Sequence, residues 1–297
     1  MTDRTPIFVG EDRKIQLGRE AEALLRETCD ADYVDDNCGI VRVPKERWAM
    51  AQRYERGTWM ESAAHAFDDR NHEHATHFEE YSALRGRFFG RAIELGCGPF
   101  TNLRVIAGSC RIARCTLVDP LVPDYLHHRN CTYRHGILRT GMTSLDSLLG
   151  GNLGGRAIRR AIRTIYPRLL ISGVPLEAAL ATSIEEMPEC GQFDLVVMIN
   201  VIEHCFDVRE ILDKVRRLCR RGSQFVFHDR LYNAATVKRE AAAHFDAGHP
   251  LRVDEGVILG FLHSTFHPLL ERRVDVRDAA CGVELTGPGI YFIGEMK

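Results

Sequence analysis

The sequence has no run of about 18 or more apolar residues, the length that a helix needs to cross a bilayer. Its opening stretch, MTDRTPIFVGEDRK, is charged and lacks the apolar centre of a secretion signal. It also contains no internal repeat and no low-complexity segment. These absences argue against a membrane span and against repeat architectures. We therefore expect a soluble protein of the cytoplasm with no membrane partner.

Paired cysteines are also missing. The ten cysteines are scattered, without a CxxC pair and without a spacing typical of a zinc site or a disulfide framework. We therefore expect free thiols, which suit the reducing conditions of the cytoplasm.

The chain carries little net charge. Its formal charge of −2 gives no strong field that would attract nucleic acid. Basic residues are not interleaved with exposed aromatic ones, so we expect no nucleic-acid partner. The charge is unevenly placed, however, because residues 129–168 carry many arginines and a single acid, Asp146.

The 297 residues divide into three stretches by their hydrophobic patterns. Residues 1–87 look largely helical and amphipathic, and we expect them to form an N-terminal helical lid. From residue 88 to about 230, short β-rich apolar runs alternate with helical patterns, as a parallel sheet requires. The remaining residues combine helical stretches with two strands that form a hairpin, FHPLLERRVDV and IYFIGEMK.

Apolar runs mark the strands of the expected sheet, and a helix lies between two of them. The segment VREILDKVRRLCRRG predicts an amphipathic helix that ends at Gly222. The predicted strands lie at residues 91–97, 114–120, 176–184, 193–201 and 223–230.

A glycine loop follows the first predicted strand of the sheet. In ELGCGPF, Gly96 and Gly98 let the backbone turn sharply and approach a ligand that a Cβ would block. The helix that follows offers free N–H groups to an anionic part of that ligand. The next predicted strand ends in Asp119, whose carboxylate can accept both hydrogen bonds of a ribose diol.

Three motifs in this region resemble those of a known family. ELGCGP, LVDP and FDLVVMINVIEH stand in the order of the first, second and fourth motifs of class I S-adenosylmethionine (SAM)-dependent methyltransferases. The resemblance covers residues 88–297. It implies SAM as the cofactor and an α/β fold with a Rossmann-like, seven-stranded, mostly parallel sheet and an antiparallel C-terminal hairpin. The sequence departs from the longer family pattern at Phe100, which replaces a third glycine.

The resemblance also implies a role for each motif position. Glu94, Gly96 and Gly98 are expected to surround the methionine part of SAM, and Asp119 to bind the ribose hydroxyls. Glu94 could instead cap neighbouring backbone amides, and Asp119 could be a turn residue before a proline. The other expected cofactor contacts are Leu121 or Pro120 against the adenine, Ser183 and Ile184 at the adenine edge, and Asn200 near the methionine amine.

Candidates for the acceptor side follow the fourth and fifth predicted strands, because ligands of this fold lie at the carboxyl ends of the strands. An oxygen or protonated nitrogen acceptor benefits from a general base. The candidates are His228, Asp229 and His204, although the motif favours a structural or cofactor-packing role for His204. Arg230 could pair with a substrate carboxylate or form a surface ion pair, and Tyr232 lies close to it in the sequence.

Both tryptophans lie in the N-terminal stretch. The helix face that they share could dock the N-terminal helices on the core. Its aromatic rings could also face the sulfonium of SAM, because aromatic faces attract cations. A lid that closes over the cofactor could combine both roles, docking on the core and facing the sulfonium. The spacing aligns Trp48, Gln52, Glu55 and Trp59 on this face, with Tyr54 nearby.

A histidine-rich segment, DDRNHEHATHFEEY, follows this helix. His74 and His77 could share a helix face, but no second His/carboxylate pair elsewhere has ligand spacing, so we expect no metal. The segment instead predicts a solvated part of the lid, or a histidine such as His77 that reaches the acceptor. Tyr81 is a candidate of the same kind.

The chain also carries an insert at about residues 130–176 that the fold does not need. It includes TSLDSLLGGNLGGRAIRRAIRTIYPRLL, a glycine hinge followed by a basic amphipathic helix. We expect a substrate cap or an oligomer contact in a monomer or homodimer. The arginines of the insert could also bind an acidic carrier protein.

Three functions fit these observations. The first is methylation of a small molecule on oxygen or nitrogen, for instance in secondary metabolism. The second keeps the fold but cyclises SAM alone: its own amine displaces methylthioadenosine, giving azetidine-2-carboxylate. The third is a non-catalytic SAM-binding module, which the intact Glu94, Gly96, Gly98 and Asp119 disfavour. We therefore expect an enzyme, a SAM-dependent transferase.

Overall fold

The computed structural model describes most of the chain. The described residues are 7–9, 14–16, 34–35, 38–61, 70–142, 171–234, 237, 247–274 and 289–297. The basic helix predicted within the insert falls on residues 143–170 and therefore lies outside the described residues.

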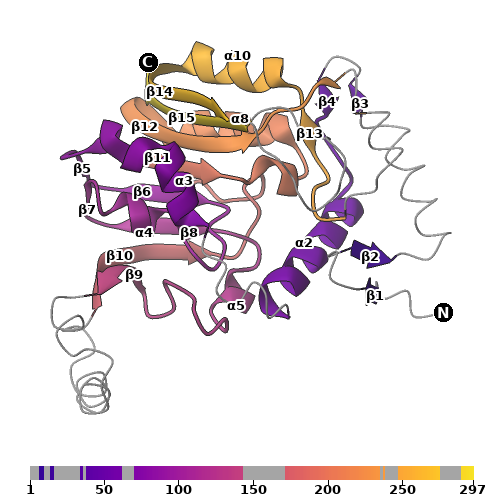
Figure 1. Cartoon of the computed structure of the whole chain (residues 1–297), viewed down its shortest axis with the longest axis horizontal. Coiled ribbons are helices and arrows are strands. Elements are labelled where there is room, and N and C mark those ends of the chain that lie inside the picture. Colours follow the sequence, from indigo (N-terminus) through magenta and orange to yellow (C-terminus); the bar gives the residue numbers. More distant parts are fainter. Residues whose placement is uncertain are drawn as a thin grey trace.

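One large β-sheet organises the described part of the chain (Figure 1). Its strand order is β14-β15-β12-β11-β6-β8-β10-β9. Strands β12, β11, β6, β8 and β10 pair in parallel, and β15 lies antiparallel between β12 and β14. This confirms the predicted Rossmann-like sheet with its antiparallel C-terminal hairpin. The strands are β6 (Ala92–Leu95), β8 (Cys115–Val118), β9 (Ile137–Met142), β10 (Ile171–Leu180), β11 (Phe193–Ile199), β12 (Cys219–Arg230), β14 (Phe266–Val274) and β15 (Gly289–Met296).

Within the described residues, the sheet has one more strand than the seven predicted. Strand β9 pairs antiparallel with the first half of β10, where Ile137 lies opposite Pro175. Strand β10 then runs parallel to β8 from Leu176 to Leu180, which confirms the strand predicted there. Strand β9 lies within the predicted insert of about residues 130–176. The described ends of this insert pair with each other and extend the sheet at its edge.

Helix α8 (Val208–Leu218) ends before Gly222, so its predicted end is wrong. The reason is that Cys219 already has extended backbone and pairs with Phe193 of β11. The register then slips, and the Ser223 hydroxyl donates a hydrogen bond to the Phe193 carbonyl oxygen at 2.7 Å. Gly222, at φ +83°, therefore lies in an irregular part of strand β12 and not at the helix end.

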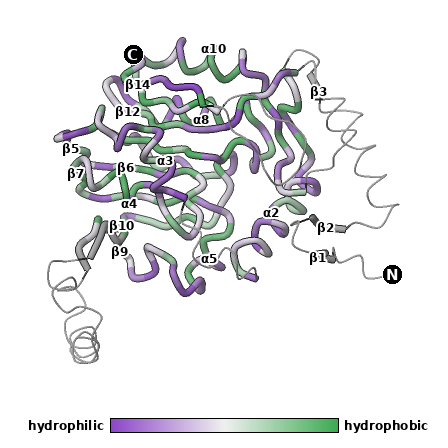
Figure 2. The backbone as a smooth tube through the Cα atoms, in the orientation of Figure 1, coloured by the Kyte–Doolittle hydropathy of each residue, from purple (hydrophilic) through white to green (hydrophobic). Residues whose placement is uncertain are grey.

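Helices cover both faces of the sheet, and the side chains of each strand alternate between them. In β11, Val196 and Met198 pack on the side of α8, whereas Val197 and Ile199 pack on the opposite side. Figure 2 shows hydrophobic residues along these inner strands. Helices α8 and α10 (Glu255–Thr265) cover the first face; α3 (Asn71–His77), η2 (Glu79–Leu84), α4 (Leu103–Ile106) and α5 (Val122–Tyr125) contribute to the second.

The N-terminal stretch contains the expected long helix, α2 (Lys45–Met60), but it also contains strands that were not predicted. Gly39, at φ +83°, lies so close to the chain at Arg252 that a Cβ would be 2.2 Å from its carbonyl oxygen. This close pairing draws the segment before α2 into a small sheet. The small strands are β3 (Val34–Asp35), β4 (Gly39–Ile40) and β13 (Arg252–Val253) in one sheet, β1 (Ile7–Val9) with β2 (Lys14–Gln16), and β5 (Phe88–Phe89) with β7 (Arg111–Ile112).

Candidate active site

The carboxyl ends of the five parallel strands lie at one edge of the sheet, and the motif residues follow those ends. An open α/β sheet binds its ligands at this edge. The topology therefore brings together residues that are up to 133 positions apart in the chain, from Gly96 to Asp229. Strand β6 leads to Gly96, β8 to Asp119, β10 to Ser183 and β11 to Asn200, while β12 includes Asp229.

The two glycines of the loop after β6 serve different purposes. Gly96 has φ +66°, and a Cβ there would lie 2.5 Å from Val201 Cγ2, so both conformation and space require glycine. Gly98 has φ +54°, and a Cβ there would meet no atom of the described residues within 4 Å. Bare backbone at Gly98 therefore borders open space, as a cofactor cradle requires.

Glu94 holds the start of the helix that follows this loop. Its Oε1 accepts hydrogen bonds from the Asn102 backbone at 2.8 Å and side chain at 3.1 Å, and its Oε2 accepts one from Leu103 N at 3.0 Å. Burial raises the pKa of Glu94 to about 7, although these hydrogen bonds oppose the rise. Glu94 thus has the capping role that the sequence left as its alternative, and it positions the glycine loop.

Asp119, which follows β8, is hydrogen-bonded to the glycine loop at Gly98. Its Oδ2 accepts a hydrogen bond from Gly98 N at 3.2 Å, and its Oδ1 accepts one from Leu121 N at 2.8 Å. Burial raises the pKa of Asp119 to about 6, and the nearby charge of Glu55 adds to the rise. A ribose diol would supply two further donors to this carboxylate. Pro120, the expected adenine contact, is half-buried beside it.

The expected adenine-edge residues follow β10. The Ser183 hydroxyl accepts a hydrogen bond from Glu186 N at 3.2 Å, and Ile184 is 3% exposed in the core. Asn200, after β11, has φ +60°, and its N–H donates to the His228 carbonyl oxygen at 2.7 Å. A non-glycine residue in the left-handed region is uncommon, and such residues cluster at ligand sites.

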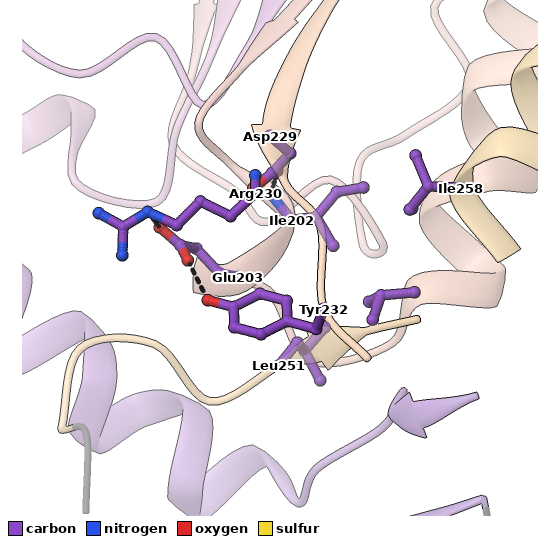
Figure 3. Close-up of a pocket in the computed structure, with 8 residues that line it drawn as sticks. Ile202, Glu203, Asp229, Arg230, Tyr232, Leu251 and Ile258 are labelled. Carbon is purple, nitrogen blue, oxygen red and sulfur yellow. Dashed lines mark hydrogen bonds and ion pairs between the residues drawn. The ribbon is translucent and has the colours of Figure 1, made fainter. Parts of the chain in front are cut away.

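A pocket lies where β11 and β12 end (Figure 3). Glu203 is 1% exposed, and its Oε2 accepts a hydrogen bond from the Tyr232 hydroxyl at 3.0 Å. Arg230 Nε lies 4.0 Å from Glu203 Oε1. Glu203 is not among the site residues predicted from the sequence, where the fourth motif points to its neighbour His204. The apolar part of the lining comprises Ile202, Leu251, Val253 and Ile258.

Asp229, a candidate base, lines the same pocket but is engaged by backbone. Its Oδ2 accepts hydrogen bonds from Ile202 N at 2.7 Å and Val201 N at 3.2 Å. Its Oδ1 accepts one from Arg230 N at 2.9 Å. Burial raises the pKa of Asp229 to about 7, and the charge of Glu203 adds to the rise. Asp229 therefore holds the turn that leads to η4 (Ile202–His204), which carries Glu203.

His228, a second candidate base, faces helix α3 and strand β15. Its ring stacks on Tyr291 with centroids 3.9 Å apart, and its Nδ1 donates to the Ile290 carbonyl oxygen at 2.9 Å. His74 approaches the same ring at 5.0 Å. Burial lowers the pKa of His228 to about 4, so the imidazole is neutral at neutral pH.

Two of the lid candidates lie in this same region. The His77 ring lies 4.7 Å from the Tyr291 ring. Tyr81 is fully buried and stacks on Phe78 at 5.1 Å, and its hydroxyl finds no hydrogen-bond partner among the described residues. Burial raises the pKa of Tyr81 well above its ordinary value. The structure thus places Tyr81 in the core and not in the pocket at residues 203–232.

Helix α2 docks on the core through the predicted stripe. The Trp48 ring meets the Phe206 ring edge-on at 5.3 Å. The Gln52 side chain donates a hydrogen bond to the His204 carbonyl oxygen at 3.0 Å. These contacts join the N-terminal helix to the last residue of the fourth motif and to Phe206 just after it.

The far end of α2 reaches the cofactor loop. Trp59 meets Phe100, the residue in place of a third glycine, with ring centroids 6.1 Å apart. Tyr54 lies against Gly248, where a Cβ would be 3.0 Å from Tyr54 Cδ1. Helix α2 therefore contacts both the glycine loop, through Trp59, and the segment around Gly248, through Tyr54.

A Rossmann-like sheet with a bare glycine loop, a buried acid after the second strand and a left-handed asparagine after the fourth defines a class I SAM-dependent methyltransferase. A family model described as a methyltransferase domain matches residues 68–258, more than half of the chain. The chain therefore belongs to this methyltransferase family, and its cofactor is SAM.

Solved structures of similar fold include two methyltransferases. The N-methyltransferase NodS from Bradyrhizobium japonicum WM9, in complex with S-adenosyl-L-homocysteine, is 18% identical with a TM-score of 0.49; the similarity covers 83% of this chain and 98% of NodS. Magnesium protoporphyrin IX methyltransferase ChlM from Synechocystis PCC 6803, with the same compound bound, is 12% identical with a TM-score of 0.47, covering 84% and 100%. No curated protein matches the sequence. Among the described residues, no helix has the length and apolar character to cross a membrane.

Proposed function

We propose that this enzyme transfers the methyl group of SAM to an oxygen or nitrogen atom of a small molecule whose reacting group lies at the carboxyl ends of β11 and β12, beside Glu203, Arg230 and Tyr232. One observation carries the proposal. The pocket places three polar side chains among apolar walls at the carboxyl ends of β11 and β12. Asn200, at the expected cofactor edge, follows the same strand β11, so an acceptor group that reaches these side chains would lie next to the methyl donor.

The polar side chains can orient an acceptor. SAM supplies a methyl group that is already activated on a sulfonium, so the protein mainly aligns the nucleophile and excludes water. The Glu203 carboxylate would accept a hydrogen bond from the acceptor O–H or N–H and take up that proton as the methyl group is transferred. Arg230 would pair with an anionic or polar group elsewhere on the acceptor.

The backbone at the cofactor edge would hold SAM itself. Gly98 leaves space for the methionine part, and Asp119 would accept hydrogen bonds from the ribose hydroxyls. Ser183 and Ile184 would border the adenine, and Trp59, on α2, would cover the loop. Helix α2 would act as the lid, which is consistent with its contacts to both the glycine loop and η4.

The pocket also bears on the alternative reaction, in which SAM cyclises to azetidine-2-carboxylate. That reaction needs no second substrate, so Glu203, Arg230 and Tyr232 would have no acceptor to bind. We therefore favour methyl transfer. A role in secondary metabolism, a cytoplasmic location, an acidic carrier partner and a monomeric or homodimeric state remain predictions.

The test follows the nucleoside product. Purified enzyme is incubated with methyl-labelled SAM, alone and with a panel of small amines, phenols and hydroxy acids, and the products are identified by mass spectrometry. The proposal predicts S-adenosylhomocysteine and a labelled acceptor only when an acceptor is present. Methylthioadenosine from SAM alone would instead establish cyclisation, and SAM binding without turnover on any acceptor would establish a binding module.

Two variants separate the acceptor pocket from the cofactor site. Arg230→Ala should raise the KM for the acceptor and leave the Kd of SAM unchanged. Asp119→Ala should weaken SAM binding itself. If Arg230→Ala instead weakens SAM binding as strongly as Asp119→Ala does, the acceptor is not bound where we propose.

A further inference from the structure

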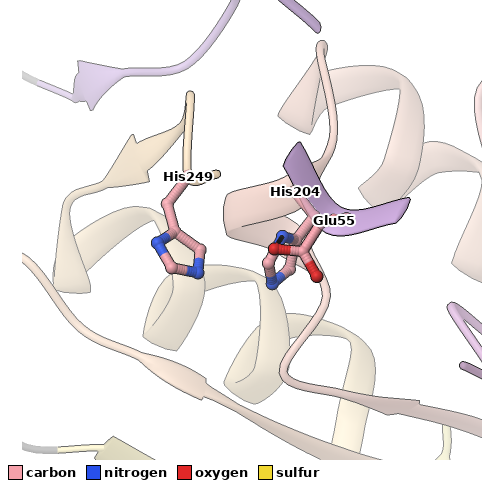
Figure 4. A group of neighbouring side chains, drawn as sticks. All are labelled: Glu55, His204 and His249. Atoms are coloured by element: carbon pink, nitrogen blue, oxygen red, sulfur yellow. Dashed lines mark ion pairs between the residues drawn. The ribbon is translucent and has the colours of Figure 1, made fainter. Parts of the chain in front are cut away.

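We infer that Glu55, His204 and His249 form a site for a divalent transition-metal ion, with Zn²⁺ the ion that fits best. Each side chain offers one ligand atom, and these atoms all lie within 4.8 Å of one another (Figure 4). Glu55 comes from α2, His204 from η4, and His249 from the segment before β13. Three elements that are distant in the sequence thus converge on one point.

Outer contacts orient each of the three side chains. The Trp59 Nε1–H donates to Glu55 Oε2 at 3.2 Å, which leaves Oε1 facing His204 Nδ1 at 3.6 Å. His204 Nδ1 also lies 3.2 Å from the Gly248 carbonyl oxygen, which favours the tautomer that donates from Nδ1 and leaves Nε2 for a metal. Glu55 Oε1 would therefore shift from Nδ1 toward Nε2 when the ion binds. Metal-binding histidines usually donate their other N–H to a carbonyl or carboxylate in this way.

The third ligand, His249, has a carboxylate beside it. His249 Nε2 lies 3.5 Å from Oε1 of Glu203, which is 1% exposed. The His204 and His249 rings lie 4.6 Å apart and tilted by 60°, so they are not stacked on each other. A buried carboxylate at this point supplies negative charge next to the proposed ion, as the outer shell of a metal site does.

The donor set selects the class of ion. Two imidazole nitrogens and one carboxylate oxygen suit Zn²⁺ and neighbouring transition metals better than Mg²⁺ or Ca²⁺, which prefer oxygen ligands. Zinc sites with three protein ligands of this kind keep a fourth position for water or a substrate atom. Ligand atoms about 2.1 Å from Zn²⁺ lie about 3.4 Å from one another in a tetrahedron, so binding would draw the three side chains slightly closer.

An ion bound at this point would hold helix α2, the proposed lid, in its closed position. Glu55 lies on the same helix as Trp59, which meets Phe100 in the cofactor loop. The two histidines lie on segments that border the acceptor pocket, since His204 follows Glu203 and His249 precedes Leu251. A metal bridge would therefore hold α2 against both segments. No metal is expected from the sequence, because no His/carboxylate pair outside the segment of His74 and His77 has ligand spacing. Sequence spacing does not reveal ligands that only the fold brings together.

The test measures metal binding directly and does not depend on the proposed acceptor. The full-length chain is stripped with a chelator and titrated with Zn²⁺ against a chromophoric competitor, then with Co²⁺ as a spectroscopic probe. We expect one equivalent of Zn²⁺, and a Co²⁺ spectrum of low coordination number. Glu55→Gln, His204→Gln and His249→Gln should each weaken Zn²⁺ binding at least tenfold. His263→Gln removes an exposed histidine that pairs with Glu271 at 2.7 Å and serves as the matched control.

A second measurement covers the case in which a variant fails to fold. Zn²⁺ should raise the melting temperature of the wild-type chain, because an ion that binds only the folded state stabilises it. The inference is overturned if wild-type protein binds no Zn²⁺ above the level of a chain with all three substitutions, or if only the control substitution weakens binding. Methyl transfer measured on the same samples keeps the two questions apart, since zinc binding without methyl transfer would refute the proposed function alone.

Discussion

The Tyr232 hydroxyl donates a hydrogen bond to Glu203 Oε2 at 3.0 Å and joins the segments that follow β12 and β11. Because Glu203 is 1% exposed, this bond fixes the direction of a carboxylate that water hardly reaches. Arg230 Nε lies 4.0 Å from its other oxygen. The carboxylate is thus held between a hydroxyl and a guanidinium, and under the proposed function its orientation would govern how an acceptor binds.

Replacing Glu203 with glutamine should abolish most methyl transfer without removing SAM binding. The amide keeps the size of the side chain but cannot take up the acceptor proton. Loss of a positioned base costs about 100- to 10,000-fold in rate. We expect kcat to fall within that range for the acceptor identified by the product assay, while the Kd of SAM changes less than about threefold.

Tyr232→Phe provides the matched comparison for Glu203→Gln. This variant keeps the carboxylate and removes only the bond that orients it, so the rate should fall less, by about tenfold. Equal losses in both variants would show that Glu203 acts through the shape of the pocket and not as the proton acceptor.

SAM affinity should depend on the ionisation of Asp119. Burial raises its pKa to about 6, and the ionised carboxylate is the form that accepts two hydrogen bonds from a ribose. Affinity should therefore be full above about pH 6 and fall up to tenfold per pH unit below it. Calorimetry at several pH values checks this, and Asp119→Asn should bind weakly with no break near that pH.

Glu94 needs a separate control, because burial raises its pKa to about 7 and it holds the same loop. Glu94→Gln should keep the break near pH 6 if Asp119 causes it. A wild-type affinity that does not change between about pH 5 and about pH 8 would contradict the role given to Asp119.

Features that depend on neighbouring residues could be predicted from the sequence. The strand before Gly96, the turn at Gly98 and the acid after β8 are local, and the hydrophobic runs that flank them set the parallel order of the sheet. The predicted end of α8 failed because strand pairing of Cys219 with Phe193 prevailed over the preference of Gly222 for a helix end.

Side-chain direction and distant contacts could not be predicted in the same way. Tyr81 lies in a turn at φ +54° that carries its ring into the core, and no periodicity signals such a backbone. The carboxylate of Asp229 accepts three backbone hydrogen bonds, a role invisible in the motif HDR. Glu203 meets Tyr232 only because β11 and β12 are neighbours, which the sequence suggests but does not detail.

Alanine substitutions at the two loop glycines should differ in their effects: Gly96→Ala should mainly lower the unfolding free energy, and Gly98→Ala should mainly weaken SAM binding. At Gly96 a methyl group would clash with Val201 at 2.5 Å, and the positive φ adds strain, so Gly96→Ala should cost about 2–4 kcal/mol of unfolding free energy. Gly98→Ala has strain but no clash and should cost about 1–2 kcal/mol, yet its methyl group would occupy the cradle. Denaturant unfolding and SAM calorimetry on both variants measure the difference.

The double variant Gly96→Ala with Val201→Ala checks the reason given for the larger loss. Removing the Val201 methyl groups relieves the clash but not the strain, so part of the stability lost in Gly96→Ala should return. An additive loss in the double variant would mean that the clash is not the cause.

The unfolding free energy should fall in acid because of His228. Burial lowers the pKa of this imidazole to about 4 in the folded chain, whereas an unfolded histidine titrates near its ordinary value of 6.5. The folded state therefore binds fewer protons between these values: this contribution to stability is complete above about pH 6.5 and is lost as the pH falls toward about 4. One such group contributes a slope of about 1.4 kcal/mol per pH unit.

His228→Asn tests this contribution, because the shorter amide can still donate to the Ile290 carbonyl oxygen but does not titrate. Its unfolding free energy, measured in denaturant at several pH values, should fall less steeply between about pH 6.5 and about pH 4 than that of the wild type. His74 approaches the same ring, and burial lowers its pKa to about 3, so adding His74→Asn should flatten the profile further. Arg70, His77 and Arg230 lower the two pKa values, whereas Glu203 raises that of His228, so all four charges stay in place in both variants. If the single variant keeps the full acid slope of the wild type, the stacked imidazole is not what makes the fold sensitive to acid.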